Sequence, residues 1–490
     1  MSIIRQHILT NLLFCLFVSG VALLFFGCAV GPDYQPPKTS TAAQWTSNMA
    51  GGETNGPVNL AHWWQNFGDT NLDALMLTAV QSNLTLQIAE AHVREARAQR
   101  GVVSGALWPS IGSDAGYSRN LYGAHAYPAL PPPLDYNLYN ANFDAAWELD
   151  VFGGTRRTVQ AASAEIGVAE YGQRDVLISV LAEVARDYIS ARAYQQRLNI
   201  AQENIRVEQN VLSLTTNRFG TGLGNNLDVQ QAKALLENTE AQIPSLQTGF
   251  DDSVYELSVL LGQPPGALMD DMTAKKDIPL TPPLVPVGLP SDLLQRRPDV
   301  QKAERELAAA TAQIGVAKAD LYPKFSLTGL AGVQSVSAGN WFNYSSKYWD
   351  AGPTVQWELF EAGSIMANIH VQNAKQEEAL DQYRQTVLTA LQDAESALTA
   401  YAREQVRRES LGESVASDRE ALNLATQLYK SGLTDFLNVL DSENALYNEQ
   451  DTLVQSDQTV SLDLVQLYKA LGGGWENEEK LSLQQDGKKL

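Results

Sequence analysis

The chain has 490 residues, of which 44% are hydrophobic and 19% are charged, a composition nearer to an ordinary folded protein than to a multi-span helical membrane protein. Its formal net charge of -21 argues against nucleic acid as a partner, because a phosphate backbone needs a basic face. The two cysteines, Cys15 and Cys28, both lie near the start, so the body of the chain carries no disulfide and no cysteine-based metal site.

Residues 1–27 have the features of an export signal. They contain one basic residue, Arg5, no acidic residue, and a long run of Leu, Phe, Val and Ala. The run ends in Phe25-Phe26-Gly27-Cys28, which is similar to a bacterial lipoprotein cleavage site with Cys28 as the lipidated first residue. Because two phenylalanines replace the usual leucine and small residue, a plain signal peptide with an incidental cysteine is the alternative.

The first half of the mature chain shows helix, strand and helix patterns in turn. Residues 28–71 are predicted to form an N-terminal tail and its continuation, rich in Pro, Gly, Ser, Thr and Asn in their first part. A helix is predicted from Leu72 to Leu107, ended by Pro109. Alternating apolar and polar residues at 111–118 and 139–148 then predict two strands of about ten residues, joined by a proline-rich loop at 127–133.

A long helix is predicted from Gly154 to Phe219, and another from Leu227 to Leu261. Gly222, between them, suits the left-handed residue that ends a helix, and Asn225 or Asn226 suits the cap of the next one. Residues 263–292 are rich in proline and are predicted to be a linker.

The same plan then occurs a second time. Leu321-Tyr322-Pro323 follows Leu107-Trp108-Pro109 by 214 positions, and Trp357-Glu358-Leu359 follows Trp147-Glu148-Leu149 by 210. Alternation at 325–334 and 349–358 predicts two more strands, a helical pattern covers 363–430, and Gly432 turns the chain into a last helix ending near Leu471, with Thr434 or Asp435 as its cap. We therefore predict a duplication, with repeats at 72–262 and 293–472 and a C-terminal tail at 473–490.

The four predicted strands have the length and the two-sided pattern of membrane-spanning β-barrel strands. Four strands cannot close a barrel, and open strand edges are not tolerated in lipid, so either several chains combine or the strands form two soluble hairpins. The export signal and the large aromatic residues on one face favour the membrane. A symmetric oligomer would also give the long helices their partners.

The chain resembles the TolC/OprM-like outer-membrane factors of bacterial tripartite efflux systems. The resemblance rests on 28–34, on Arg296-Arg297-Pro298-Asp299-Val300, on the two Trp-Glu-Leu corners, on the two helix tips and on 467–475. It implies an α+β membrane protein, namely a homotrimer with a twelve-stranded transmembrane β-barrel, four strands per chain, continued by a periplasmic α-helical barrel. It also implies the outer membrane of a Gram-negative bacterium as location, a periplasmic membrane-fusion adaptor and an inner-membrane resistance-nodulation-division pump as partners, and passive export of small molecules as function.

The resemblance places the candidate sites at the two tips. Leu437 and Asp441 match a hydrophobic and an acidic ring that close the tunnel at its periplasmic end, and their spacing puts them on one helix face. Gly222, Asp228, Gly432 and Asn438 match positions at which the tips dock to the adaptor. Asn438 carries an amide where some relatives have a second acid, and Asp228 is its counterpart in the first repeat. A solvated aspartate and a packing leucine are the alternative interpretation of Asp441 and Leu437.

No catalytic, cofactor or metal site is predicted. The glycine-rich segment 220–224 follows a helix and lacks a Walker lysine, and the five histidines have no metal-ligand spacing. A periplasmic coiled-coil scaffold or adaptor lipoprotein is the competing hypothesis, but it predicts no aromatic alternating strands. An envelope hydrolase lacks the residues for its chemistry. The sequence does not specify the exported compound or the cognate pump.

Overall fold

The computed structural model describes residues 29–39, 42, 44–46, 53–54, 60–122, 134–279, 281–282 and 285–476. Cys28, the predicted export signal at 1–27 and the predicted loop at 127–133 lie outside the described residues. The chain divides into two compact units, each built from both halves of the sequence. The first unit combines Met1–Pro37, Val93–Ala169 and Ala303–Tyr383, and the second combines Lys38–His92, Glu170–Lys302 and Arg384–Leu490.

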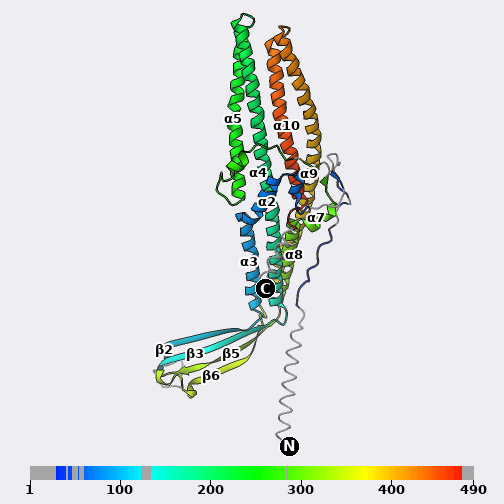
Figure 1. Ribbon diagram of the computed structural model, residues 1–490. Coiled ribbons are helices and arrows are strands. Elements are labelled where there is room, and N and C mark those ends of the chain that lie inside the picture. The colour runs from blue at the N-terminus through cyan, green and yellow to red at the C-terminus, as the bar shows by residue number, and fades with distance from the viewer. Residues whose placement is uncertain are drawn as a thin grey trace. The chain divides into compact units, whose positions relative to one another are not determined.

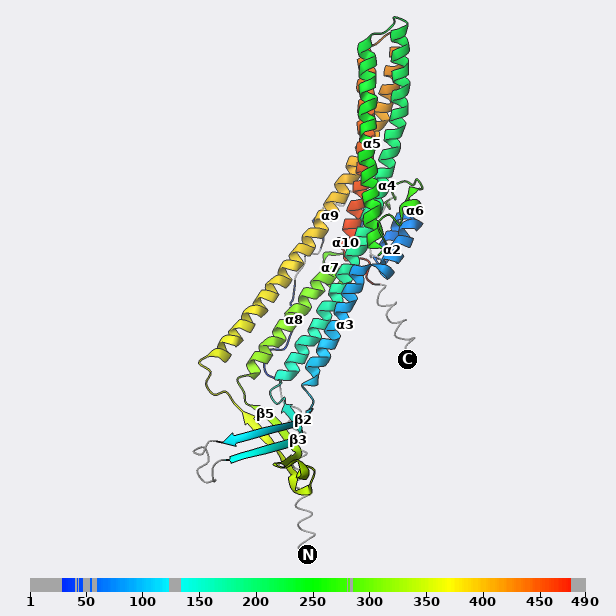
Figure 2. The same ribbon diagram turned by 90° about the vertical axis from the view of Figure 1, so that its left-hand side faces the viewer.

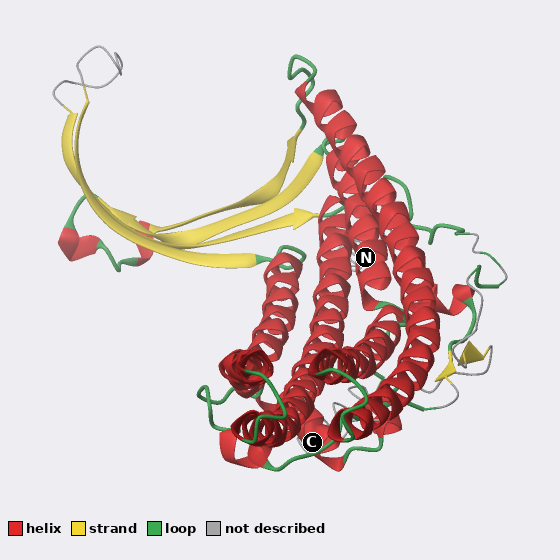
Figure 3. Ribbon diagram, turned by 90° about the horizontal axis from the view of Figure 1, so that it is seen from above, coloured by secondary structure: helices red, strands yellow, loops and turns green. Residues whose placement is uncertain are grey.

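One four-stranded antiparallel sheet belongs to the first unit. Its strand order is β2-β3-β5-β6 (Figure 1), and Figure 3 shows the sheet bent along its strands. The strands are β2 Ser110–Tyr122, β3 Leu134–Leu149, β5 Lys324–Ser335 and β6 Lys347–Gln356. All four predicted strands are therefore confirmed, and the first two are longer than predicted. Two short 3-10 helices, Ala338–Asn340 and Tyr344–Ser346, lie in the connection between β5 and β6.

The register of the sheet places apolar residues opposite apolar residues and polar residues opposite polar ones. Phe143 of β3 pairs with Ala331 of β5, which pairs with Trp349 of β6, and both aromatic side chains are exposed, at 67% and 78%. On the other face, the Asn140 side chain donates to the Asp114 carboxylate over 2.9 Å. Because side chains alternate between the faces of a strand, the pairing gives one apolar and one polar face. Strands β2 and β6 each pair on one side only among the described residues.

The helices reproduce the predicted duplication in both length and spacing. The helix before each hairpin has 22 residues, each long helix has 67, and each helix after a tip has 35. They are α3 Leu84–Gly105 and α8 Pro298–Ala319, α4 Gly154–Gly220 and α9 Ser364–Lys430, and α5 Asn226–Leu260 and α10 Phe436–Ala470. No helix in the described part of the chain has a stretch long and apolar enough to cross a bilayer.

The predicted helix from Leu72 to Leu107 is in fact two helices, α2 Thr70–Ser82 and α3. The break falls at Asn83, whose backbone is extended, with φ -64° and ψ 124°. The side-chain carbonyl oxygen of Asn83 accepts a hydrogen bond from the Leu86 amide at 2.9 Å, and the side-chain NH2 group donates to the Leu260 carbonyl at 2.8 Å. The apolar periodicity continues across the break, so periodicity alone does not reveal it. The break is indicated instead by Asn83, a residue type that favours the cap position of a new helix.

Short elements from the tail and the linker pack on the second unit. Strand β1 Glu53–Thr54 pairs in parallel with β4 Val285–Pro286. The 3-10 helix η1 Trp63–Phe67 stacks Trp63 on Tyr468 of α10, with ring centroids 5.3 Å apart. The linker also contains α6 Met269–Thr273 and the start of α7 Pro290–Arg296. Arg192 of α4, which is fully buried, donates to the Met272 and Ala274 carbonyls at 3.1 and 2.8 Å. Backbone carbonyl groups of the linker thus accept hydrogen bonds from one buried guanidinium group, which holds this part of the linker in place.

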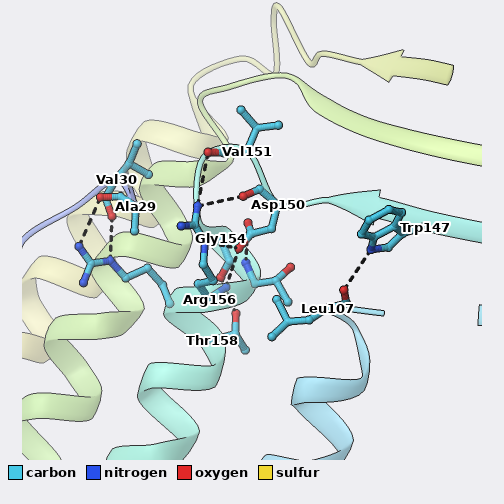
Figure 4. Close-up of polar contacts among 11 residues, drawn as sticks. Ala29, Val30, Leu107, Trp147, Asp150, Val151, Gly154, Arg156 and Thr158 are labelled. Carbon is cyan, nitrogen blue, oxygen red and sulfur yellow. Dashed lines mark hydrogen bonds and ion pairs between the residues drawn. The ribbon is translucent and has the colours of Figure 1, made fainter. Parts of the chain in front are cut away.

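The two Trp-Glu-Leu corners of the first unit use the same contact. The Trp147 indole donates to the Leu107 carbonyl at 3.0 Å (Figure 4), and the Trp357 indole donates to the Leu321 carbonyl at 3.1 Å. Each bond ties the end of a strand to the turn before its hairpin. The duplication therefore extends to individual hydrogen bonds.

Candidate functional site

Both hairpin tips of the second unit end a long helix on a left-handed glycine. Gly222 has φ +76° and Gly432 has φ +73°. The Leu223 amide donates back to the Arg218 carbonyl at 2.8 Å, and the Leu433 amide donates to the Leu428 carbonyl at 2.9 Å. These bonds satisfy the last carbonyls of each helix, as in a Schellman motif. The predicted helix ends at the two glycines are confirmed.

The two tips differ in how the next helix begins. In the first tip, the Asn225 side chain accepts from the Asp228 amide at 2.9 Å, so the expected cap is present. In the second tip, Asp435 occupies the cap position but its side chain makes no capping hydrogen bond. Instead the Asn438 side chain donates to the Thr434 hydroxyl at 2.6 Å. The predicted cap position at Asp435 is therefore confirmed, but the expected hydrogen bond to its side chain is absent.

The α4–α5 and α9–α10 hairpins lie side by side at their tips in both views (Figures 1 and 2). A small apolar cluster joins them, made of Ala232 from α5, Tyr429 from α9, and Phe436 and Val439 from α10. The Tyr429 and Phe436 rings are 5.5 Å apart. Packing between the two repeats thus continues to the end of the helices, which makes the paired tips one structural element.

Arg218 of α4 connects the first tip to the second. Its guanidinium lies 4.7 Å from the centre of the Tyr429 ring and donates to the Tyr429 carbonyl at 3.3 Å. Burial raises the pKa of the Tyr429 hydroxyl, and the nearby Asp228 carboxylate raises it further. Sequence reasoning missed this contact. Tyr429 is the counterpart of Phe219 at a shift of 210, yet Tyr429 is 4% exposed and Phe219 is 47% exposed.

The predicted gate residues lie on the open face of α10. Leu437 is 53% exposed, and Asp441, one helical turn later, is also exposed. Phe436 and Val439 on the opposite face are almost completely buried. The structure therefore brings Leu437 and Asp441 together with Asn438 on one exposed face. It places Asp228, which is half-buried, on the other hairpin beside Tyr429.

A second feature that sequence reasoning missed is a pair of buried acids behind the tips. Glu208 of α4 and Glu443 of α10 are each 2% exposed. The Thr239 hydroxyl donates to Glu208 at 2.7 Å, whereas neither Glu443 oxygen has a hydrogen-bond partner among the described residues. Burial raises the pKa of both carboxyls to about 7, and the charge of Glu208 contributes to the shift at Glu443.

Comparison with known proteins identifies the class. The model of the outer membrane efflux protein family matches residues 75–263 and 289–473. The chain belongs to this family. It is 34% identical over 421 residues to the pyoverdine export outer membrane protein OpmQ of Pseudomonas putida, covering 84% of this chain and 88% of that protein. It is 29% identical over 472 residues to nodulation protein T of Rhizobium leguminosarum bv. trifolii, covering 94% and 98%.

The fold agrees with that assignment. The solved structure of the outer-membrane channel OprN superimposes with a TM-score of 0.86 and 33% sequence identity, over 91% of this chain and 100% of that one. The chain is thus an outer-membrane channel of an efflux system, in which the helical part lies in the periplasm. Family membership also rules out the scaffold hypothesis.

Proposed function

We propose that three copies of this chain close one exit duct, and that the helix tips are its gate. The observation that carries the trimer is the open sheet, in which no other described strand pairs with the outer edges of β2 and β6 and large apolar side chains are exposed on one face. Lipid does not tolerate unpaired strand edges, and barrels of this kind have at least about eight strands. Three sheets of four strands satisfy both conditions and give the twelve-stranded barrel that the family resemblance implies.

The gate follows from the open face of α10. If this face points at the threefold axis, three Leu437 side chains form an apolar ring, and three Asp441 carboxylates form an acidic ring one turn away. The leucines exclude water and ions from the closed pore. The carboxylates repel one another unless a cation or protons intervene. The three tips therefore attract one another at the leucine ring and repel one another at the carboxylate ring. Such an arrangement has a closed and an open state, and a partner can bias it towards the open state.

The partner at the tips would be a periplasmic adaptor, which connects the duct to an inner-membrane resistance-nodulation-division pump. Leu223 and Leu433, directly after the tip glycines, are 71% and 75% exposed and offer an apolar docking contact. Gly222, Asp228, Gly432 and Asn438 shape that contact. Export of small molecules is supported by the pyoverdine export named for OpmQ. In this scheme a lipid on Cys28 and the barrel both anchor the duct in the outer membrane.

Conductance in planar bilayers tests the gate. Leu437→Ala is expected to raise the resting conductance, because the apolar ring loses most of its side chain. Asp441→Ala is expected to abolish block by divalent cations added on the periplasmic side. Leu388→Ala in α9 is the matched control, since Leu388 is also exposed, at 62%, but lies far from the tip in sequence. Wild-type behaviour of both tip variants would move the gate to the first tip and Asp228.

A further inference from the structure

The segment that directly follows Cys28 is held by the first unit. Figure 4 shows Ala29 and Val30 beside the start of α4, next to the corner formed by Asp150 and Val151. The Val30 amide donates to the Phe152 carbonyl at 3.0 Å, so the tail is joined to this corner through its backbone. The described part of the tail motif, 29–34, whose role the channel function leaves unexplained, thus has a defined binding partner.

Arg157 of α4 provides most of that binding. Its side chain is 4% exposed. Its Nε donates to the Val30 carbonyl at 3.0 Å, and its Nη2 donates to the carbonyls of Gly31 and Ala29 at 3.2 and 3.5 Å and lies 2.9 Å from the Asp33 carboxylate. Among the described hydrogen-bond partners of its side chain, only Gln160, which accepts from Nη1 at 2.8 Å, is not part of the tail. A buried guanidinium is costly without acceptors, so the site needs the tail as its ligand.

Three glycines allow the two backbones to approach. Gly31 has φ +93°, and a Cβ there would lie 2.5 Å from the Gly315 Cα. Gly153 has φ +82°, and a Cβ there would lie 2.6 Å from Ala29. A Cβ on Gly315 would meet the Arg157 side chain at 2.7 Å. The fit is therefore specific for glycine on both sides of the contact, beyond what a loosely packed tail requires.

A second contact lies three residues further along the tail. The Tyr34 hydroxyl donates to the Glu304 carboxylate of α8 at 2.9 Å, and the Arg305 guanidinium lies 5.6 Å from the Tyr34 ring. Burial and the hydrogen bond to Glu304 raise the pKa of Tyr34. The tail is thus held at both ends of 29–34, by an arginine on α4 and by a charged pair on α8.

The duplicated corner shows that Arg157 is not needed to form a corner. At a shift of 210, Asp150, Arg156 and Arg157 correspond to Phe360, Met366 and Ala367. That second corner keeps its tryptophan bond to the Leu321 carbonyl and the start of its long helix without these residues. The polar residues therefore belong to the one corner that receives the tail.

We propose that Arg157, Gly153 and Gly315 form a receptor site whose ligand is the chain's own mature N-terminus, residues 29–34. By holding the first residues after Cys28 at the start of α4, the site fixes the tether of any lipid on Cys28 to the unit that carries the sheet. The lipid anchor and the sheet then act as one membrane attachment. This role is independent of the gate and of the number of chains in the duct.

Hydrogen–deuterium exchange of the purified full-length channel, followed by mass spectrometry, tests the proposal. The amides of the tail peptide 29–35, in which Pro32 has none and the Val30 amide donates to the Phe152 carbonyl, are expected to be protected in the wild type. Arg157→Lys, which keeps the charge but loses the forked geometry, should raise their exchange rate about tenfold or more. Asp33→Ala removes the carboxylate contact to Arg157, and Gly31→Ala adds a Cβ that clashes with Gly315. Both variants should act likewise, with exchange of the sheet unchanged. Arg100→Ala is the control, because Arg100 is in the same unit and donates to Ser163 at 2.8 Å instead of the tail.

Two outcomes would overturn the proposal. One is a tail that exchanges as fast in the wild type as in the three variants, or as slowly in the variants as in the wild type. The other is a loss of labelled palmitate incorporation in Arg157→Lys with tail exchange unchanged, which would assign Arg157 to processing of the leader. Palmitate incorporation equal to wild type, together with faster tail exchange, is the expected result.

Discussion

At the scale of single residues, the buried pair Glu208 and Glu443 predicts that the stability of the tip region depends on pH. A carboxyl whose pKa is raised in the folded state binds more protons there than in the unfolded chain. Its contribution to stability is complete below pH 4.5 and is lost as the pH rises through about 7. Glu240 adds to the shift at Glu208, and Thr239 opposes it by hydrogen bonding. The tip region should therefore be more stable in mild acid than at pH 8.

We predict that Glu443→Gln stabilises the protein at pH 8 by on the order of 2 kcal/mol and leaves stability at pH 5 nearly unchanged. The amide keeps the shape of the side chain but removes the charge that burial penalises. Thermal unfolding in mild detergent at the two pH values measures the difference. Glu420→Gln, at an exposed position of α9, is the control and should change neither value. An equal effect of Glu443→Gln at both pH values would contradict the prediction.

These residue contacts could be predicted only in part. The spacing of Leu437 and Asp441 correctly places both on one exposed face, because that depends on one helix alone. The contact between Arg218 and Tyr429 depends on how two hairpins from different repeats pack, which no local pattern contains. For the same reason the burial of Tyr429 differs from that of its counterpart Phe219. The acids at 208 and 443 sit in patterns that equally suit a solvated face.

At the scale of elements, the left-handed glycines determine the shape of the tips. Gly432→Ala is predicted to destabilise the protein by about 1 kcal/mol, because an L-residue is strained at φ +73° even though the space beside the glycine is open. Gly412→Ala is the matched control in the same helix hairpin. Gly412 lies inside α9 with open space around it, so alanine there should be neutral or stabilise by up to about 1 kcal/mol. Thermal unfolding separates the two, and equal effects would contradict this view of the tip.

Most helices and strands could be predicted because the sequence contains the same series of elements twice. The shifts of 210 and 214 read from short motifs are reproduced by every pair of equivalent helices. The helix break at Asn83 and the short elements of the linker were not predicted. They depend on tertiary contacts, such as those of Asn83 with Leu260 and of Arg192 with Met272. Local periodicity does not record such contacts.

At the scale of the whole molecule, one chain is an incomplete membrane element. Within the described part of the chain its sheet has two open edges, and exposed apolar side chains such as Ile111 and Trp349 need a lipid environment. Family membership establishes the channel, but the number of chains that form it remains our proposal. The number of chains also decides whether the exposed face of α10 can form rings, because Leu437 and Asp441 face an axis only in a closed oligomer.

The mass of the purified channel in mild detergent, measured by light scattering with the detergent contribution removed, therefore tests the central claim most directly. The predicted result is a single species containing three chains, each of 53.5 kDa less the removed leader, which separates into single chains after heating in strong detergent. A monodisperse single chain in mild detergent would contradict the trimeric duct and, with it, the gate.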